Sequence, residues 1–215
     1  MLHRRITALA GATAAATTLG VLATAAPATA APAPGERSLV TVLDADGNRF
    51  DRKWNDFDIV HKAATTVLGA KPDSAVGVLA DGSTAVTAFL PTDRAFRKLV
   101  RQVGGTPQQL RSERAVFDAV ANTFDVDTIE AVLLYHVVPG ATVTYRQAQH
   151  ADGAALDTAA DAPITVNVRG HQVYLRDADT DDANARVLRR AADVNKGNLQ
   201  IAHGINRVLR PVDLP

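Results

Sequence analysis

The sequence predicts an α+β fold, because helical patterns dominate its first half and strand patterns its second. Apolar residues recur at helical spacing over 57–67, 95–103 and 129–135, whereas residues 164–175 alternate between apolar and polar positions. The order of these patterns does not alternate strand with helix along the chain. We therefore expect helices gathered on one side of the sheets, not parallel strands joined by crossover helices.

The first predicted elements are one strand and one helix. Residues 39–43 form a β-prone run, and the turn-forming residues 44–48 follow it, so that we expect a first strand and a loop. Asn55 or Asp56 is a suitable N-cap for the next helix, and Gly69 stands where that helix would end.

A strand-to-helix corner comes next. Residues 85–90 are β-prone, and Pro91 ends the run. Thr92 or Asp93 can cap a helix that stops at the glycine pair starting with Gly104. Capping is sufficient to explain both polar residues and contributes about 1 kcal/mol.

The remaining elements follow from turn and cap residues. Pro107 can open a helix and Asp127 can cap another, which Pro139 and a following glycine end. A β-hairpin is expected with its turn near Gly170, and residues 201–209 provide a last β-prone run.

The N-terminus has the pattern of a secretory signal. A basic start precedes the apolar residues 6–26, and small residues before Ala30 form a cleavage site. Residues 1–30 are thus expected to be a signal peptide, 31–37 a Pro/Ala/Gly linker and 38–212 one domain. The alternative is an uncleaved membrane anchor, which the Ala- and Thr-rich composition disfavours.

The amino-acid composition and charge exclude some classes of protein. The chain of 215 residues has no cysteine and a net charge of zero at pH 7, so that packing must stabilise the exported domain without disulfides. Balanced charge gives no general attraction to nucleic acid. No later apolar run is long enough to span a membrane, and a soluble, secreted product without stable membrane insertion is expected.

Tyr135 and His136 are the first candidates for chemistry. A phenol beside an imidazole suggests proton transfer. Adjacent residues on a helix diverge by about 100°, however, so that the two side chains would not face one site. We expect His136 to be structural, with its ring hydrogen-bonded at the end of the helix.

Motifs for metal binding and catalysis are incomplete. The acidic runs at 44–48 and 177–182 begin like EF-hand loops, but Arg49 and Asp182 occupy the sixth position, where glycine is needed. The histidines lack zinc-site spacing, and no Gly-x-Ser-x-Gly elbow surrounds any serine. We expect no catalytic residue, no cofactor and no metal site, with weak calcium binding at either acidic run as the alternative.

One basic cluster stands beside the second acidic run. It consists of Arg186, Arg189, Arg190 and Lys196, and it could meet an anionic wall polymer or an acidic protein. Because residues 177–182 precede it closely, we expect the two groups of charges to screen each other.

Three segments resemble the signature segments of the fasciclin domain family. Residues 87–96 follow Thr-x-Phe-x-Pro-Thr-x-x-Ala-Phe, residues 133–140 are similar to Leu-Leu-Tyr-His-Val-Val-Pro-Gly, and residues 199–211 are similar to the family's closing segment. The resemblance implies a wedge-shaped β-sandwich with several helices packed on one side. It also implies an extracellular adhesion or interaction module.

Two departures from the family pattern stand out. Asn206 replaces the usual acid in the closing segment, which puts in doubt any ligand contact that needs a carboxylate there. Residues 104–127 are longer than the family norm, and an extra surface helix there is a candidate for specificity. The residues expected to have structural or interaction roles are Thr92, Asp93, Tyr135, His136, Pro139, His203 and Asn206.

The leading hypothesis is a secreted, non-catalytic interaction module that binds an extracellular protein or a cell-wall polysaccharide. A small-ligand or lipid carrier is the alternative, because 47% of the residues are hydrophobic and few are aromatic. An unrecognised hydrolase comes third and would need an acid, a histidine and a serine or threonine to converge.

Overall fold

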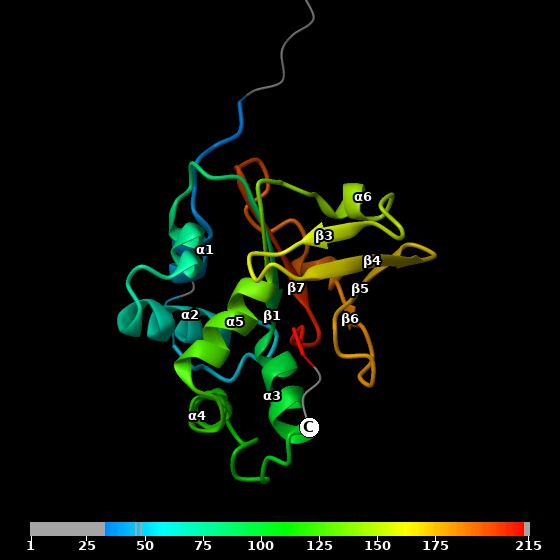
Figure 1. Cartoon of the computed structure of the whole chain (residues 1–215). Coiled ribbons are helices and arrows are strands. Elements are labelled where there is room, and N and C mark those ends of the chain that lie inside the picture. The colour runs from blue at the N-terminus through cyan, green and yellow to red at the C-terminus, as the bar shows by residue number, and fades with distance from the viewer. Residues whose placement is uncertain (1–32, 46, 48, 213–215) are drawn as a thin grey trace, which may run out of the picture. The chain divides into compact units, whose positions relative to one another are not determined.

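Helices and two β-sheets make up the part of the chain that the computed structural model describes, residues 33–45, 47 and 49–212 (Figure 1). The expected signal peptide lies outside these residues. Within them, no helix is both long enough and apolar enough to cross a membrane. The architecture confirms the α+β fold.

The helices precede most of the strands, as the sequence predicts. They are α1 (Leu39–Asp44), α2 (Asp58–Ala70), α3 (Asp93–Gln102), α4 (Glu113–Thr123), α5 (Val126–Tyr135) and the short α6 (Tyr145–Ala148), with 3-10 turns at Ala75–Ala80 and Arg189–Ala191.

The strands form two sheets. In the first, β1 (Val86–Pro91) lies between β2 (Val137–Pro139), which is antiparallel to it, and β7 (Gln200–Ile205), which is parallel. The second sheet is antiparallel in the order β3 (Ala155–Asp157), β4 (Pro163–Arg169), β5 (Gln172–Arg176) and β6 (Ala185–Arg186). The predicted β4–β5 hairpin is confirmed, with Gly170 at a φ of 62° in its turn.

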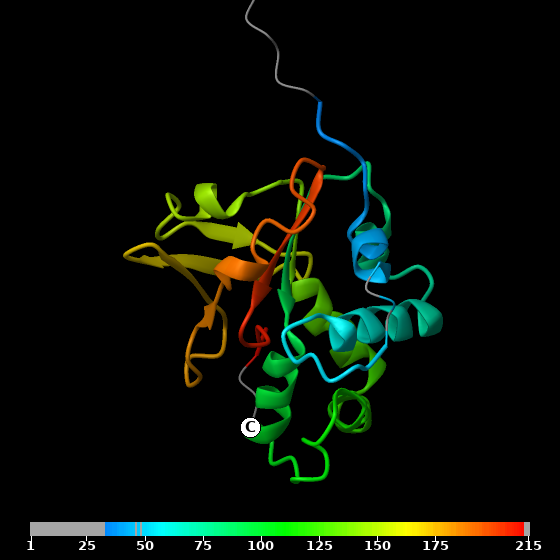
Figure 2. The same cartoon turned by 180° about the vertical axis from the view of Figure 1, so that it is seen from behind.

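Strand β1 separates two hydrophobic cores. Ala88 and Leu90 pack with the helices, whereas Phe89 between them packs with the second sheet. This alternation follows from the two-residue period of a strand. Figures 1 and 2 accordingly show α2, α4 and α5 on one side of β1 and strands β3 to β6 on the other.

The first predicted strand is wrong, because residues 39–44 form α1. The Ser38 hydroxyl accepts a hydrogen bond from the backbone N–H of Thr41 at 3.2 Å and caps the helix. Leu39 is buried, and its N–H donates to the side chain of Gln200 at 2.8 Å. A serine cap and a tertiary hydrogen bond thus override the β propensity of the run.

The boundaries predicted between residues 104 and 127 also need correction. Ser112 and Asp125 cap α4 and α5, not Pro107 and Asp127. Helix α4 buries Val116, among others, in the first core, so that it is not a helix lying free on the surface. Whether this region gives binding specificity stays a prediction.

Part of the expected linker is bound to the domain. The N–H of Gly35 donates to the carbonyl of Gly197 at 2.8 Å, and the N–H of Arg37 donates to the Asn198 side chain at 3.1 Å. Residues 35–37 therefore follow the surface of the domain.

Candidate functional site

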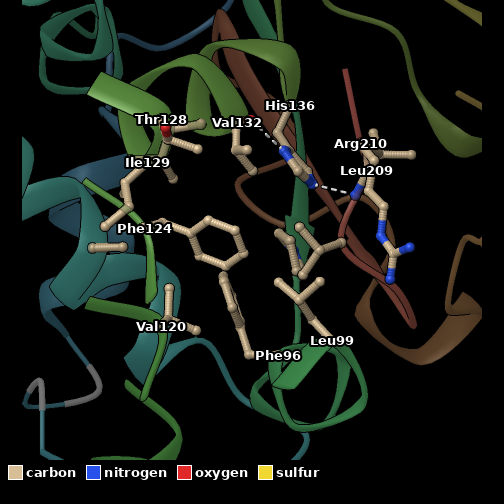
Figure 3. A pocket seen from close by; sticks show the side chains of 14 residues that line it. Phe96, Leu99, Val120, Phe124, Thr128, Ile129, Val132, His136, Leu209 and Arg210 are labelled. Atoms are coloured by element: carbon tan, nitrogen blue, oxygen red, sulfur yellow. Dashed lines mark hydrogen bonds between the residues drawn. The ribbon is translucent and has the colours of Figure 1, made fainter. Parts of the chain in front are cut away.

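His136 ends α5 and connects two distant parts of the backbone (Figure 3). Its Nδ1–H donates to the carbonyl of Val132 at 2.7 Å, and its Nε2 accepts the N–H of Leu209 at 2.8 Å. The residue is only 3% exposed. Burial lowers the pKa of His136 to about 4, although the bond to Val132 opposes this shift. The ring is therefore neutral near pH 7.

Tyr135 points into the hydrophobic core on the side of the second sheet. Its ring is fully buried among side chains of the second sheet, and its hydroxyl donates to the carbonyl of Pro163 at 3.1 Å. Burial raises the pKa of the Tyr135 phenol. The two side chains diverge as the helix geometry predicts, and they do not form one site for proton transfer.

His203 makes similar contacts on β7. Its Nε2–H donates to the carbonyl of Val143 at 2.7 Å, and its Nδ1 accepts the N–H of Asp193 at 3.2 Å. Burial lowers the pKa of this histidine as well. His136 and His203 thus each use both ring nitrogens to bind backbone groups, which leaves neither nitrogen of these two residues available to a substrate in this conformation.

We expected Thr92 or Asp93 to cap helix α3, but neither side chain does so. Thr92 is the N-cap residue of α3, but its side chain makes no capping hydrogen bond. The carboxylate of Asp93 accepts the N–H of Ile59 at 2.9 Å and so caps α2. The first N–H groups of α3, those of Asp93 and Arg94, donate instead to carbonyls of the loop before α2, at 3.1 Å and 2.9 Å.

Pro139 and Asn206 are the least buried of the seven expected residues. Pro139 is exposed at the end of β2. Asn206 is half-buried; its side-chain oxygen accepts the N–H of Arg186 at 2.7 Å, and its carbonyl accepts from the Lys98 ammonium at 3.0 Å. The other five are buried, so that in this conformation a partner could touch Pro139 and Asn206 most readily.

An open pocket of about 540 Å³ lies beside Asn206, and we call it the arginine pocket. Arg186, Arg189 and Arg190 line it together with Asn55, Gln172 and residues 187, 188 and 191. The three arginine residues are exposed, and none of them forms an ion pair with any residue that the structure describes.

The acidic run forms no direct ion pair with these three arginines among the described residues. Within 177–182, Asp179 pairs with Arg210 at 2.7 Å and Asp182 pairs with Arg207 at 2.7 Å. Lys196, the fourth member of the basic cluster, pairs with Asp193 and does not line the arginine pocket. The carboxylates thus neutralise arginines of the C-terminal segment.

The pKa of Lys98 indicates a positive electrostatic potential near this pocket. Burial lowers the pKa of its ammonium, and the charges of Arg207, Arg186 and Arg94 lower it further, whereas Asp182 opposes them. Three guanidinium groups close enough to shift one ammonium indicate a local excess of positive charge around α3 and β6.

A second cavity has His136 among its lining residues (Figure 3). It is lined by apolar side chains of the helices, including Phe96 and Phe124, and by the C-terminal segment at Leu209. Its volume is about 40 Å³. An apolar cavity of about 150 Å³ is the size known to take up benzene, so that this one is too small for a lipid chain without rearrangement.

The serines of the described part have structural hydrogen bonds. The hydroxyls of Ser38, Ser74 and Ser112 each accept a backbone N–H at the start of a helix, and that of Ser83 donates to Asp81. None of these serines is hydrogen-bonded to a histidine in the described residues. The convergence that a serine hydrolase needs is therefore not formed there.

Arg210 is a residue that the sequence pattern does not single out. It is 6% exposed, its Nη1 pairs with the buried Asp179, and its Nη2 donates to the side chain of Gln102 at 2.8 Å. Its partners lie 31 and 108 residues away in the chain, so that no local spacing reveals the contact.

Comparison with known proteins finds a matching family model and similar solved structures. A family model described as Fasciclin domain matches residues 63–211. The fold is also similar to a solved FAS1 domain pair from the insect cell adhesion molecule fasciclin I, with a TM-score of 0.53 and 16% sequence identity. That likeness covers 82% of this chain and 51% of the other, so that this chain spans about half of the solved pair. No curated protein shows a significant match.

Proposed function

Because this chain belongs to the fasciclin domain family, we propose that it is a secreted, non-catalytic interaction module that binds an anionic polymer of the cell envelope, such as an acidic polysaccharide. Fasciclin domains are typically adhesion or interaction modules, which supports the class of function. The basic and apolar pattern of residues 1–30 supports export. The chemistry of the arginine pocket supports the choice of an anionic partner.

The observation that carries the proposal is that three exposed guanidinium groups share one open pocket. Arg186, Arg189 and Arg190 have no carboxylate partner among the described residues, and they line a space of about 540 Å³. A guanidinium presents several N–H donors in one plane and binds carboxylate or phosphate groups in two-point contacts. Uronate or phosphodiester groups of an envelope polymer fit such a surface.

Asn206 strengthens this positive character. The family pattern has an acid at this position, and Asn206 lies directly against Arg186 and Lys98. An acid there would place a negative charge beside two cations of the patch. The amide keeps the hydrogen bond to the Arg186 backbone without that charge.

Binding titrations test the proposal. We expect the purified protein to bind a polyuronate and a poly(glycerol phosphate), but not neutral dextran, and to lose affinity as salt is added. The double variant Arg189→Gln/Arg190→Gln should bind at least about tenfold more weakly. Arg111→Gln/Arg114→Gln, which removes two exposed arginines elsewhere, is the matched control. Equal binding by both double variants would contradict the role of the pocket.

A further inference from the structure

Five carboxylates converge where α2, α3 and α4 begin. Two overlapping groups of three have ligand atoms within 4.8 Å of one another, and Asp58 belongs to both groups. Asp51 and Glu113 complete the first group, and Asp56 and Asp93 complete the second. Figure 2 shows the loop before α2, coloured cyan, passing toward α3.

Most of this acidic cluster is buried. Asp58, Asp93 and Glu113 are 7%, 0% and 1% exposed, whereas Asp51 is exposed and Asp56 is half-buried. An ion could therefore enter from the side of Asp51. The ammonium of Lys53 pairs with Asp51 at this edge, but neither Asp93 nor Glu113 forms an ion pair within the described part of the chain.

Glu113 provides evidence that does not depend on the number of acids. Its Oε2 accepts the N–H of Arg52 at 2.9 Å, which fixes the side chain in the cluster. Its Oε1 is buried and has no hydrogen-bond partner, and the residue belongs to the group with Asp51 and Asp58. A buried carboxylate oxygen without a partner is costly, and an ion at the centre of the cluster would remove that cost.

The remaining negative charge needs a balancing group as well. Each of the three helices has an acid in its first turn, where the helix dipole offsets part of the charge. Asp56 and Asp93 stand together in one of the two groups, so that their carboxylates repel each other unless a proton or a cation lies between them.

We propose that Asp51, Asp56, Asp58, Asp93 and Glu113 form a binding site for one Ca²⁺ ion. The donors are all carboxylate oxygens, which suit a hard cation, and the cluster includes no histidine or cysteine for zinc. Ca²⁺ accepts six to eight oxygen ligands in flexible geometry, whereas Mg²⁺ demands a regular octahedron and retains water. Sites in extracellular modules work at about 10⁻⁴–10⁻³ M Ca²⁺.

This site differs from the EF-hand-like runs at 44–48 and 177–182. Three of its acids come from one loop and the start of α2, and α3 and α4 supply one acid each. Asn55 belongs to the same loop and lines the arginine pocket, so that Ca²⁺ would also hold one wall of that pocket in place.

Terbium luminescence tests the site directly, because Tb³⁺ takes the oxygen ligands of Ca²⁺ and the chain contains a single tryptophan, Trp54, in the binding loop. We expect excitation of Trp54 to produce terbium emission that CaCl₂ abolishes by competition and MgCl₂ affects weakly. Calcium at 100-fold above its Kd should raise the melting temperature by about 5 to 10 °C relative to EDTA.

Glu113→Gln should remove both responses, because it retains the size of the side chain and deletes one charge. Asp118→Asn on the exposed face of the same helix is the matched control and should keep them. A calcium response that persists in Glu113→Gln would overturn the proposal, since the ion would then bind elsewhere. The proposal would also be overturned if the unaltered protein showed no calcium response and Glu113→Gln had a higher melting temperature. That result would indicate that protons, not a cation, balance the charge of the cluster.

Discussion

The Nε2 of His136 accepts the backbone N–H of Leu209 at 2.8 Å, across 73 residues of chain. The other ring nitrogen donates to Val132 one helical turn earlier, so that the imidazole joins the end of α5 to the segment after β7. Arg210 follows directly in that segment and reaches the buried Asp179. His136 of the signature segment therefore positions the C-terminal part of the domain.

Replacement of His136 by alanine should reduce the free energy of unfolding by about 1 to 3 kcal/mol, because the buried N–H of Leu209 loses its acceptor. Urea denaturation followed by circular dichroism measures the change. His150→Ala is the control, since that exposed ring also bonds a carbonyl four residues earlier but holds no distant segment. Equal stability of the two variants would show that the connection does not matter.

The pH dependence of stability should carry the signature of His136. Its pKa is about 4 in the fold and 6.5 in the unfolded chain, so that the unfolded chain binds more protons between these values. Its contribution is full above pH 6.5 and falls by about 3 kcal/mol as the pH drops to 4. Asp177, whose pKa burial raises to about 6, acts in the opposite sense over part of this range.

The difference between the unaltered protein and His136→Gln isolates the histidine, because Asp177 is common to both. We expect the stability difference to shrink from pH 7 to pH 4 in urea titrations at each pH. A difference that is constant with pH would mean that His136 is not held neutral by the fold.

Arg210→Met should cost about 3 to 5 kcal/mol of unfolding free energy, because it leaves the charge of Asp179 buried without its partner. The double variant with Asp179→Asn should recover part of this loss, as a double-mutant cycle would show. Arg207→Met, at a more exposed pair, should cost about 1 kcal/mol or less. If the two single arginine variants lose the same stability, burial of the pair is not the cause.

Asn206→Asp should weaken binding of a polyanion by about two- to tenfold without unfolding the protein. The carboxylate can still accept the N–H of Arg186, but it adds a negative charge beside Lys98. Titrations at low and high salt should show the difference shrinking as salt increases. Asn122→Asp, an equal charge change on the exposed face of α4, should leave affinity unchanged.

Much of the fold could be predicted from local patterns. The periodicity of α2, α3 and α5 and the alternation of the β4–β5 hairpin are strong signals because each element buries one face. The strand prediction for residues 39–43 was wrong because the conformation of this run depends on a serine cap and on Gln200, which lies 161 residues away from Leu39. Periodicity cannot report such a contact.

The candidate sites were less accessible to sequence reasoning. His136 could be assigned a structural role from helix geometry, but the identity of Leu209 as its partner required the fold. The basic run at 186–190 was visible, whereas the pairing of its acidic neighbours with Arg207 and Arg210 was not. The acidic cluster could not be predicted from the sequence because its carboxylates come from three separate stretches of chain.

An NMR titration of the isotopically labelled protein with poly(glycerol phosphate) tests the central claim most directly. We expect the largest shift changes at the amides of Arg186, Arg189, Arg190 and Asn55, with reversal on addition of salt. Changes centred instead on the apolar cavity beside His136, or no change at any polymer concentration, would contradict an interaction module that binds anionic polymers through the arginine pocket.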